Sequence, residues 1–137
     1  MTRNEAREIL MQIMYEMEAS KDMTADNGER LAEERLSGNH KTRGAKLLRD
    51  IAENLQSIDE TINDSSKAWK TSRMSKVDLA IIRLAVGEII YSPDVPTAVA
   101  INEAINLAKK YSAAQSARFI NGVLGAAAKS DRIKTND

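Results

Sequence analysis

The chain has 137 residues, of which 42% are hydrophobic, and its 20 lysines and arginines balance 20 aspartates and glutamates. This composition is typical of one globular domain with its own core, and the lack of cysteine excludes a disulfide framework, a cysteine nucleophile and a thiolate zinc site. Because the net charge is zero, any binding to nucleic acid must come from a localised basic patch.

The first half of the chain shows the apolar spacing of amphipathic helices. Thr2 and Glu5 have the spacing of a capping box, which predicts a first helix over about residues 3–19. Residues 20–28 are typical of a loop, and a short charged helix is expected over 29–36, ended by Gly38 and Asn39. A third helix then carries one apolar stripe, formed by Leu48, Ile51, Leu55, Ile58 and Ile62.

The second half begins with residues 63–75, which have no clear period and are interpreted as a junction between two subdomains. Ser75 and Asp78 have the spacing of a helix cap. The fourth helix that they begin has apolar residues in nearly every direction, as a buried central helix does. A fifth helix is expected with Thr97 as its N-cap, and a last helix near Ser116. The polar tail from residue 129 is expected to be frayed.

Together these elements predict an all-α fold. We expect a single compact domain over residues 1–137, with about seven helices in two packed subdomains at about 1–66 and 67–130. Residues 131–137 form the polar tail.

Two residues inside the predicted helices need a tertiary explanation. Arg83 lies in the apolar fourth helix, so its guanidinium must find a carboxylate, and Glu88 and Glu103 are the candidates. Gly122 interrupts the last helix, which indicates that another helix approaches closely there.

The sequence offers little for catalysis. His40 is the only histidine and is expected in a solvated loop, and no glycine-rich phosphate loop or paired histidines are present. We therefore expect no enzyme activity, no metal site and no cofactor. The N-terminus does not resemble a secretory signal, and the longest apolar region, residues 77–90, contains charges and is too short to span a bilayer. A cytoplasmic protein without a membrane partner is expected.

Two basic regions are candidates for binding. Lys67, Lys70, Arg73 and Lys76 surround the only tryptophan, Trp69, and the combination of cations with an exposed ring suits single-stranded nucleic acid. The alternative is that Trp69 fills the junction and the lysines only aid solubility. The second region lies around the turn before the last helix and contains Lys109, Lys110 and Arg118.

Several segments keep a distinctive order and spacing: residues 77–85, 95–96, 99–104, 107–111 and 119–124. In the first helix, Ala6, Arg7 and Glu8 are followed by Gln12 and Tyr15. This pattern closely resembles the NusB family of transcription antitermination factors. The resemblance spans essentially the whole chain and is most specific in the C-terminal half.

The resemblance implies an all-helical RNA-binding factor that pairs with ribosomal protein S-ten, known in this role as NusE, on boxA RNA. This pair recruits an antitermination complex to RNA polymerase, chiefly on ribosomal RNA operons, without a cofactor. Tyr15 and Asp78 match positions that face NusE, and both are expected to be partly exposed. By the same resemblance, the residues expected to bind RNA are Arg3, Arg7, Gln12, Arg118 and Phe119.

Two other functions remain open at this point. One is a NusB-like targeting module of a ribosomal RNA cytosine methyltransferase, whose catalytic domain needs a glycine-rich cofactor loop and cysteines that this sequence lacks. The other is a helical protein adaptor without an RNA role. Asn4 and Glu5 interrupt the arginine cluster that the family often carries, which predicts weak intrinsic RNA affinity. Monomer and homodimer are both compatible with the sequence.

Overall fold

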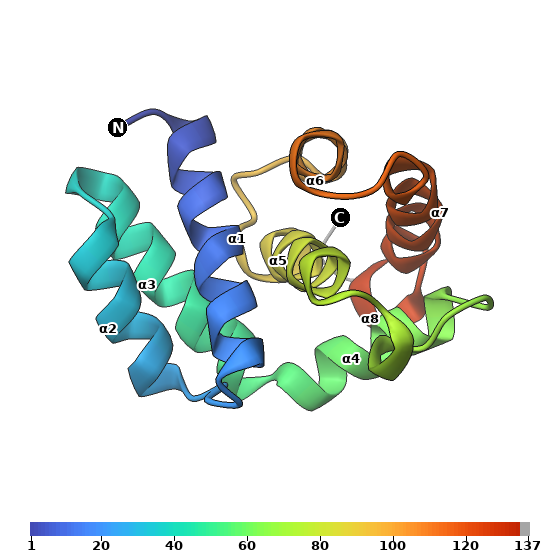
Figure 1. Ribbon diagram of the computed structural model, residues 1–137, viewed down its shortest axis with the longest axis horizontal. Helices are drawn as coiled ribbons and strands as arrows, with labels where there is room; N and C mark the ends of the chain where they lie inside the picture. Colours follow the sequence, from blue (N-terminus) through green and yellow to red (C-terminus); the bar gives the residue numbers. More distant parts are fainter. Residues whose placement is uncertain (135–137) are drawn as a thin grey trace.

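The computed structural model describes residues 1–134, and in that range the chain is helical with no strand (Figure 1). The predicted all-α fold is therefore confirmed. The elements are α1 (Arg3–Ala19), α2 (Ala25–Arg35), α3 (Gly38–Glu53), α4 (Leu55–Ser65), the short 3-10 helix η1 (Thr71–Arg73), α5 (Lys76–Tyr91), α6 (Thr97–Tyr111), α7 (Ser116–Ala128) and α8 (Asp131–Lys134).

The predicted boundaries are correct for α1 and the start of α7, and wrong for α2. The Thr24 hydroxyl accepts a hydrogen bond from the Asn27 N–H, so α2 begins at Ala25 inside the expected loop. Gly38 begins α3 with a positive φ of 58° rather than ending α2. At α6 the N-cap is Pro96, one residue before the predicted Thr97.

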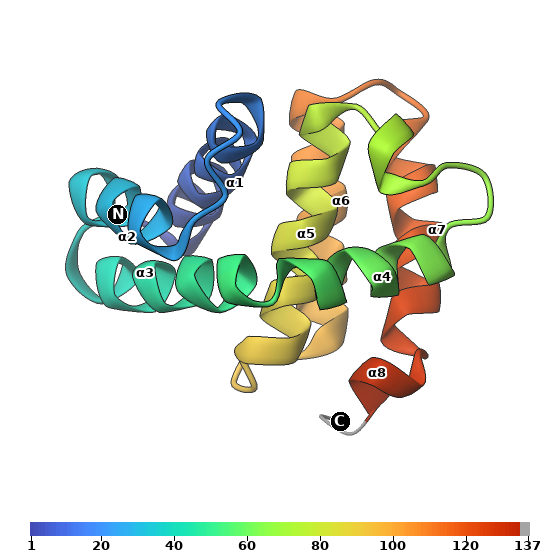
Figure 2. The same cartoon turned by 90° about the horizontal axis from the view of Figure 1, so that it is seen from below.

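The predicted third helix is divided at Asn54 into α3 and α4. Asn54 has φ −122° and ψ 24°, outside the helical region, and its side-chain amide donates to the Asp50 carbonyl at 2.8 Å. The two helices nevertheless lie end to end along one side of the molecule (Figure 2). Ile51 and Ile58, on either side of the break, are both fully buried. The break therefore interrupts the helix but leaves the apolar stripe in the core.

Helix α5 lies at the centre of the fold and packs against α1, α3, α4, α6 and α7 (Figure 1). Every residue from 78 to 89 is buried, which confirms the prediction of a buried central helix. Helices α1, α2 and α3 pack together on one side, and α4 and α7 lie on the other. Packing around this apolar helix therefore joins the two sides into one hydrophobic core.

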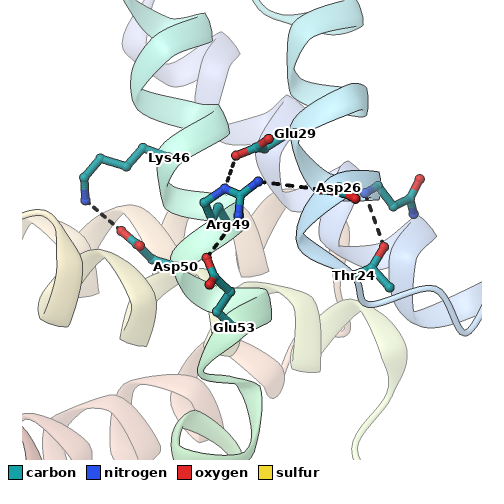
Figure 3. Close-up of polar contacts among 8 residues, drawn as sticks. Thr24, Asp26, Glu29, Lys46, Arg49, Asp50 and Glu53 are labelled. Carbon is teal, nitrogen blue, oxygen red and sulfur yellow. Dashed lines mark hydrogen bonds and ion pairs between the residues drawn. The ribbon is translucent and has the colours of Figure 1, made fainter.

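Ion pairs of Arg49 join α2 and α3 at the surface (Figure 3). The Arg49 guanidinium on α3 contacts the carboxylates of Glu29 and Asp26 on α2, and that of Glu53 on its own helix. The hydrogen bond from Arg49 lowers the pKa of the Glu29 carboxyl below its usual value. Because these groups are solvated, they help to set the alignment of the two helices more than they stabilise the fold.

Arg83 pairs with carboxylates that the sequence did not indicate. Its guanidinium donates to both carboxylate oxygens of Asp59 on α4, at 2.9 and 2.8 Å, and lies 3.3 Å from Glu18 on α1. The predicted partners, Glu88 and Glu103, are wrong. Glu88 lies five residues further along α5, roughly 140° around the helix, and pairs with Arg7 on α1 instead.

The prediction of a frayed tail is wrong for residues 131–134. They form α8, and Ile133 is fully buried in the core. The rest of the predicted tail, residues 135–137, lies outside the described residues. The segment therefore packs against α7, and the burial of Ile133 favours that position.

Two helical glycines differ sharply in the space around them, and this contrast gives a stability prediction. A Cβ at Gly87 in α5 would lie 2.5 Å from both Cγ1 and Cδ1 of the buried Ile51. At Gly122 a Cβ would meet nothing within 4 Å, so the predicted close approach there is wrong.

Gly122→Ala should raise the free energy of unfolding by about 0.5–1 kcal/mol through helix propensity. Gly87→Ala should lower it, because overpacking a core costs about 1–3 kcal/mol.

Urea unfolding of the two variants measures this difference directly, and the shared Gly→Ala change makes each the control for the other. Equal shifts of the two midpoints would mean that α3 and α5 are not in close contact at Gly87.

Candidate nucleic-acid interface

The N-terminus of α1 presents two arginines on one side of the helix. The Thr2 hydroxyl accepts from the Glu5 N–H, and the Glu5 carboxylate accepts from the Thr2 N–H, both at 3.1 Å, so the predicted capping box is present. This cap begins the helix at Arg3, whose side chain is exposed. Arg3 and Arg7 line the same cleft.

Arg7 is held by an ion pair with Glu88 on α5. Its Nε lies 3.3 Å from both carboxylate oxygens and its Nη2 lies 3.1 Å from Oε2. The side chains are only 14% and 8% exposed, respectively, so the pair is largely out of water. Nη1 makes no hydrogen bond among the described residues. Arg7 thus joins α1 to α5 through Nε and one N–H of Nη2, and both N–H groups of Nη1 remain for other contacts.

The cleft beside Arg3 and Arg7 has a volume of about 440 Å³ and lies between α1, α3 and the connection from α5 to α6. Arg43 on α3 pairs with Asp94 of that connection at 2.7 Å, and its hydrogen bond lowers the pKa of the Asp94 carboxyl. His40 also lines the cleft, in the first turn of α3 rather than in a loop, with Nε2 3.2 Å from the Met1 carbonyl.

The sequence did not indicate that Arg43 lines this cleft. Its partner Asp94 is distant in the chain, and no local pattern marks the pair.

Gln12 and Tyr15 lie further along α1 and line neither this cleft nor the one described below. Gln12 is exposed, and Tyr15 is 40% exposed, as predicted. On the same helix Glu8 binds the ammonium group of Lys110, and this hydrogen bond raises the Lys110 pKa. Of the basic residues around the turn before the last helix, Lys110 is therefore already paired with a carboxylate.

Asp78 is buried, with 9% exposure, so the prediction that it is partly exposed is wrong. Its Oδ1 accepts the Ser112 hydroxyl at 2.5 Å and its Oδ2 accepts the Ser116 hydroxyl at 3.0 Å. Its own N–H donates to the Ser75 hydroxyl, which is the predicted cap of α5. The carboxylate therefore ties the start of α5 to the turn between α6 and α7.

A second cleft, with a volume of about 390 Å³, lies between the start of α5, the segment before it and α7. Phe119 and Asp78 line it together with Trp69 and Arg73. Trp69 is 51% exposed, so the alternative in which it fills the predicted junction is wrong. Arg118 lies directly before Phe119 on α7. It is also exposed, but it does not line the cleft.

Arg3 and Arg7 are thus brought together at one cleft, and Asp78 and Phe119 at another. Among residues 1–134, no three histidine, aspartate or glutamate side chains are grouped in a way that could hold a metal ion. In the same range, none of the helices has both the length and the apolar character that crossing a bilayer requires.

A sequence profile described as the NusB family matches residues 4–129. The chain belongs to the NusB family. It is 44% identical to the transcription antitermination protein NusB of Acetivibrio thermocellus over 91% of this chain and 87% of that protein. It is 39% identical to NusB of Alkaliphilus oremlandii over the full length of both chains.

The NusB fold is also seen by direct comparison of structures. The solved structure of T. maritima NusB matches with a TM-score of 0.86 at 31% identity and covers 99% of this chain and 96% of that one. The resemblance noted in the sequence is confirmed over both halves of the chain.

Proposed function

We propose that this NusB-family chain is a transcription antitermination factor that binds boxA RNA together with NusE, ribosomal protein S-ten. In this role it joins the antitermination complex of RNA polymerase on ribosomal RNA operons in the cytoplasm, and it acts by binding rather than by catalysis. The observation that carries the proposal is the family match over residues 4–129, combined with arginines that the fold leaves available for phosphate.

The predicted RNA residues differ in how freely they can act. Arg3 and Arg118 are exposed and form no ion pair with the described residues, so both can neutralise phosphates. Arg7 offers RNA mainly Nη1, because Nε and one N–H of Nη2 donate to Glu88. Phe119 contributes an aromatic face, and Gln12 an exposed amide on α1.

For the NusE contact, Tyr15 offers an exposed ring on α1. Asp78 acts differently from the charged contact first expected. Since both of its oxygens accept serine hydroxyls, it supports a partner surface by holding the turn between α6 and α7 in place.

The proposal predicts that RNA binding is electrostatic. Arg3→Ala and Arg118→Ala should each weaken binding to boxA RNA and flatten the log–log salt dependence by ~0.7, the value for one phosphate contact on a single strand. Fluorescence anisotropy over a salt series, with and without NusE, measures both quantities. Lys41→Ala is the matched control, because Lys41 is an exposed cation that lines neither cleft.

Unchanged affinity and slope in both arginine variants would place the RNA surface elsewhere. NusE binding that persists at high salt while the wild-type protein binds no RNA would instead identify a protein adaptor.

A further inference from the structure

The segment between α4 and α5 holds its tryptophan in a fixed position. The hydroxyl of the buried Ser66 accepts from the Trp69 N–H at 3.3 Å and donates to the Trp69 carbonyl. The Thr71 N–H donates to the Asn63 side chain at 2.8 Å, and the Lys70 ammonium donates to the Asn63 carbonyl at 3.0 Å. The segment is thus tied to the end of α4 at Trp69 and at the two residues that follow it.

This rigid segment leaves the ring of Trp69 half in water. The hydrogen bonds that hold it use the Trp69 backbone and neighbouring residues, and none involves the indole. A large ring that contributes little to the core, on a segment already ordered without it, is a preformed contact surface. In Figure 2 the segment passes beside α7, and there Trp69 and the half-buried Phe119 line one cleft.

The exposed charges next to the residues that line this cleft are positive, whereas the carboxylate of Asp78, which also lines it, is buried and accepts two serine hydroxyls. Lys67, Arg73, Lys76 and Arg118 are all exposed and form no ion pair with the described residues. Arg73 also lines the cleft. Lys110, by contrast, forms an ion pair with Glu8. Two aromatic rings bordered by unpaired cations are complementary to a nucleotide, whose base can stack while its phosphate is neutralised.

We propose that the cleft lined by Trp69, Arg73 and Phe119 holds one unpaired base of the RNA, stacked on Trp69, with Arg73 neutralising the adjacent phosphate. This inference rests on the proposed RNA-binding function and adds Trp69 and Arg73 to its contacts. The cleft volume of about 390 Å³ lies within the ~300–1,000 Å³ typical of sites for small ligands.

The test uses the fact that Trp69 is the only tryptophan in the chain. Adding boxA RNA to the full-length wild-type protein, with and without NusE, should quench its fluorescence and shield it from iodide. Trp69→Leu, which keeps apolar bulk but removes the ring, should weaken RNA affinity roughly five- to hundredfold, with the salt slope unchanged. Trp69→Phe should retain most of the affinity. Arg73→Ala should flatten the salt slope by ~0.7, whereas Lys41→Ala should not.

Each contrary outcome has a distinct meaning. If the wild-type protein binds RNA but Trp69 fluorescence is unchanged and Trp69→Leu binds equally well, the stacking site is wrong while the proposed function stands. If Trp69→Leu weakens NusE binding without changing RNA affinity, the cleft contacts protein and the proposal is overturned. If the wild-type protein binds no RNA even with NusE, both proposals fail.

Discussion

Asp59→Ala is expected to lower the free energy of unfolding by about 3–5 kcal/mol, one of the two largest effects predicted for this protein. Asp59 is the principal partner of Arg83, whose side chain is only 6% exposed at the centre of the fold. Burial alone lowers the Arg83 pKa, but the hydrogen bonds to Asp59 and the charges of Asp59 and Glu18 outweigh it and raise the pKa. The guanidinium therefore stays charged, and without Asp59 it would be buried with only the more distant Glu18.

Chemical denaturation of Asp59→Ala measures this loss of unfolding free energy, and two further variants serve as comparisons. Arg83→Met should cost less, because it removes the buried charge and leaves two carboxylates that water can reach. Glu34→Ala removes a partner of Arg30 from an exposed pair on α2 and should change stability by less than ~0.5 kcal/mol. If Asp59→Ala were as mild as Glu34→Ala, Arg83 would not depend on Asp59.

Arg7→Ala should cost a similar ~3–5 kcal/mol, because it leaves the carboxylate of Glu88 buried and unpaired. This residue was predicted from the sequence as an RNA contact, and the ion pair gives it a second role in joining α1 to α5. Loss of RNA binding in Arg7→Ala would therefore mix a lost phosphate contact with a weakened fold.

A double variant separates the two roles. Arg7→Ala combined with Glu88→Gln should recover much of the lost stability, since the remaining polar group is neutral. RNA affinity should not recover with it if the N–H groups of Arg7 that Glu88 leaves free contact phosphate. Thermal unfolding and anisotropy on the same two proteins give both readouts. A single variant as stable as the double variant would show that the Arg7–Glu88 pair does not support the fold.

The sequence by itself determined the helical class, the bounds of α1 and the burial of α5. These features follow from the capping box at Thr2 and Glu5 and from the periodicity of apolar residues, which are local properties of the chain. The same local patterns carried the resemblance to the NusB family, which the comparisons confirm.

Only the tertiary structure decided which charges remain available for binding. Arg83 pairs with Asp59, 24 residues away in the sequence, and Arg7 pairs with Glu88, 81 residues away. Asp78 is likewise bound by two serines, Ser112 at the end of α6 and Ser116 at the start of α7. Helical periodicity assigns a residue to a face of its own helix, but it does not say which distant side chain covers that face. A carboxylate partner reduces what a cation can offer to RNA, as Glu88 does for Arg7, so the assignment of binding residues depends on long-range packing that no local pattern records.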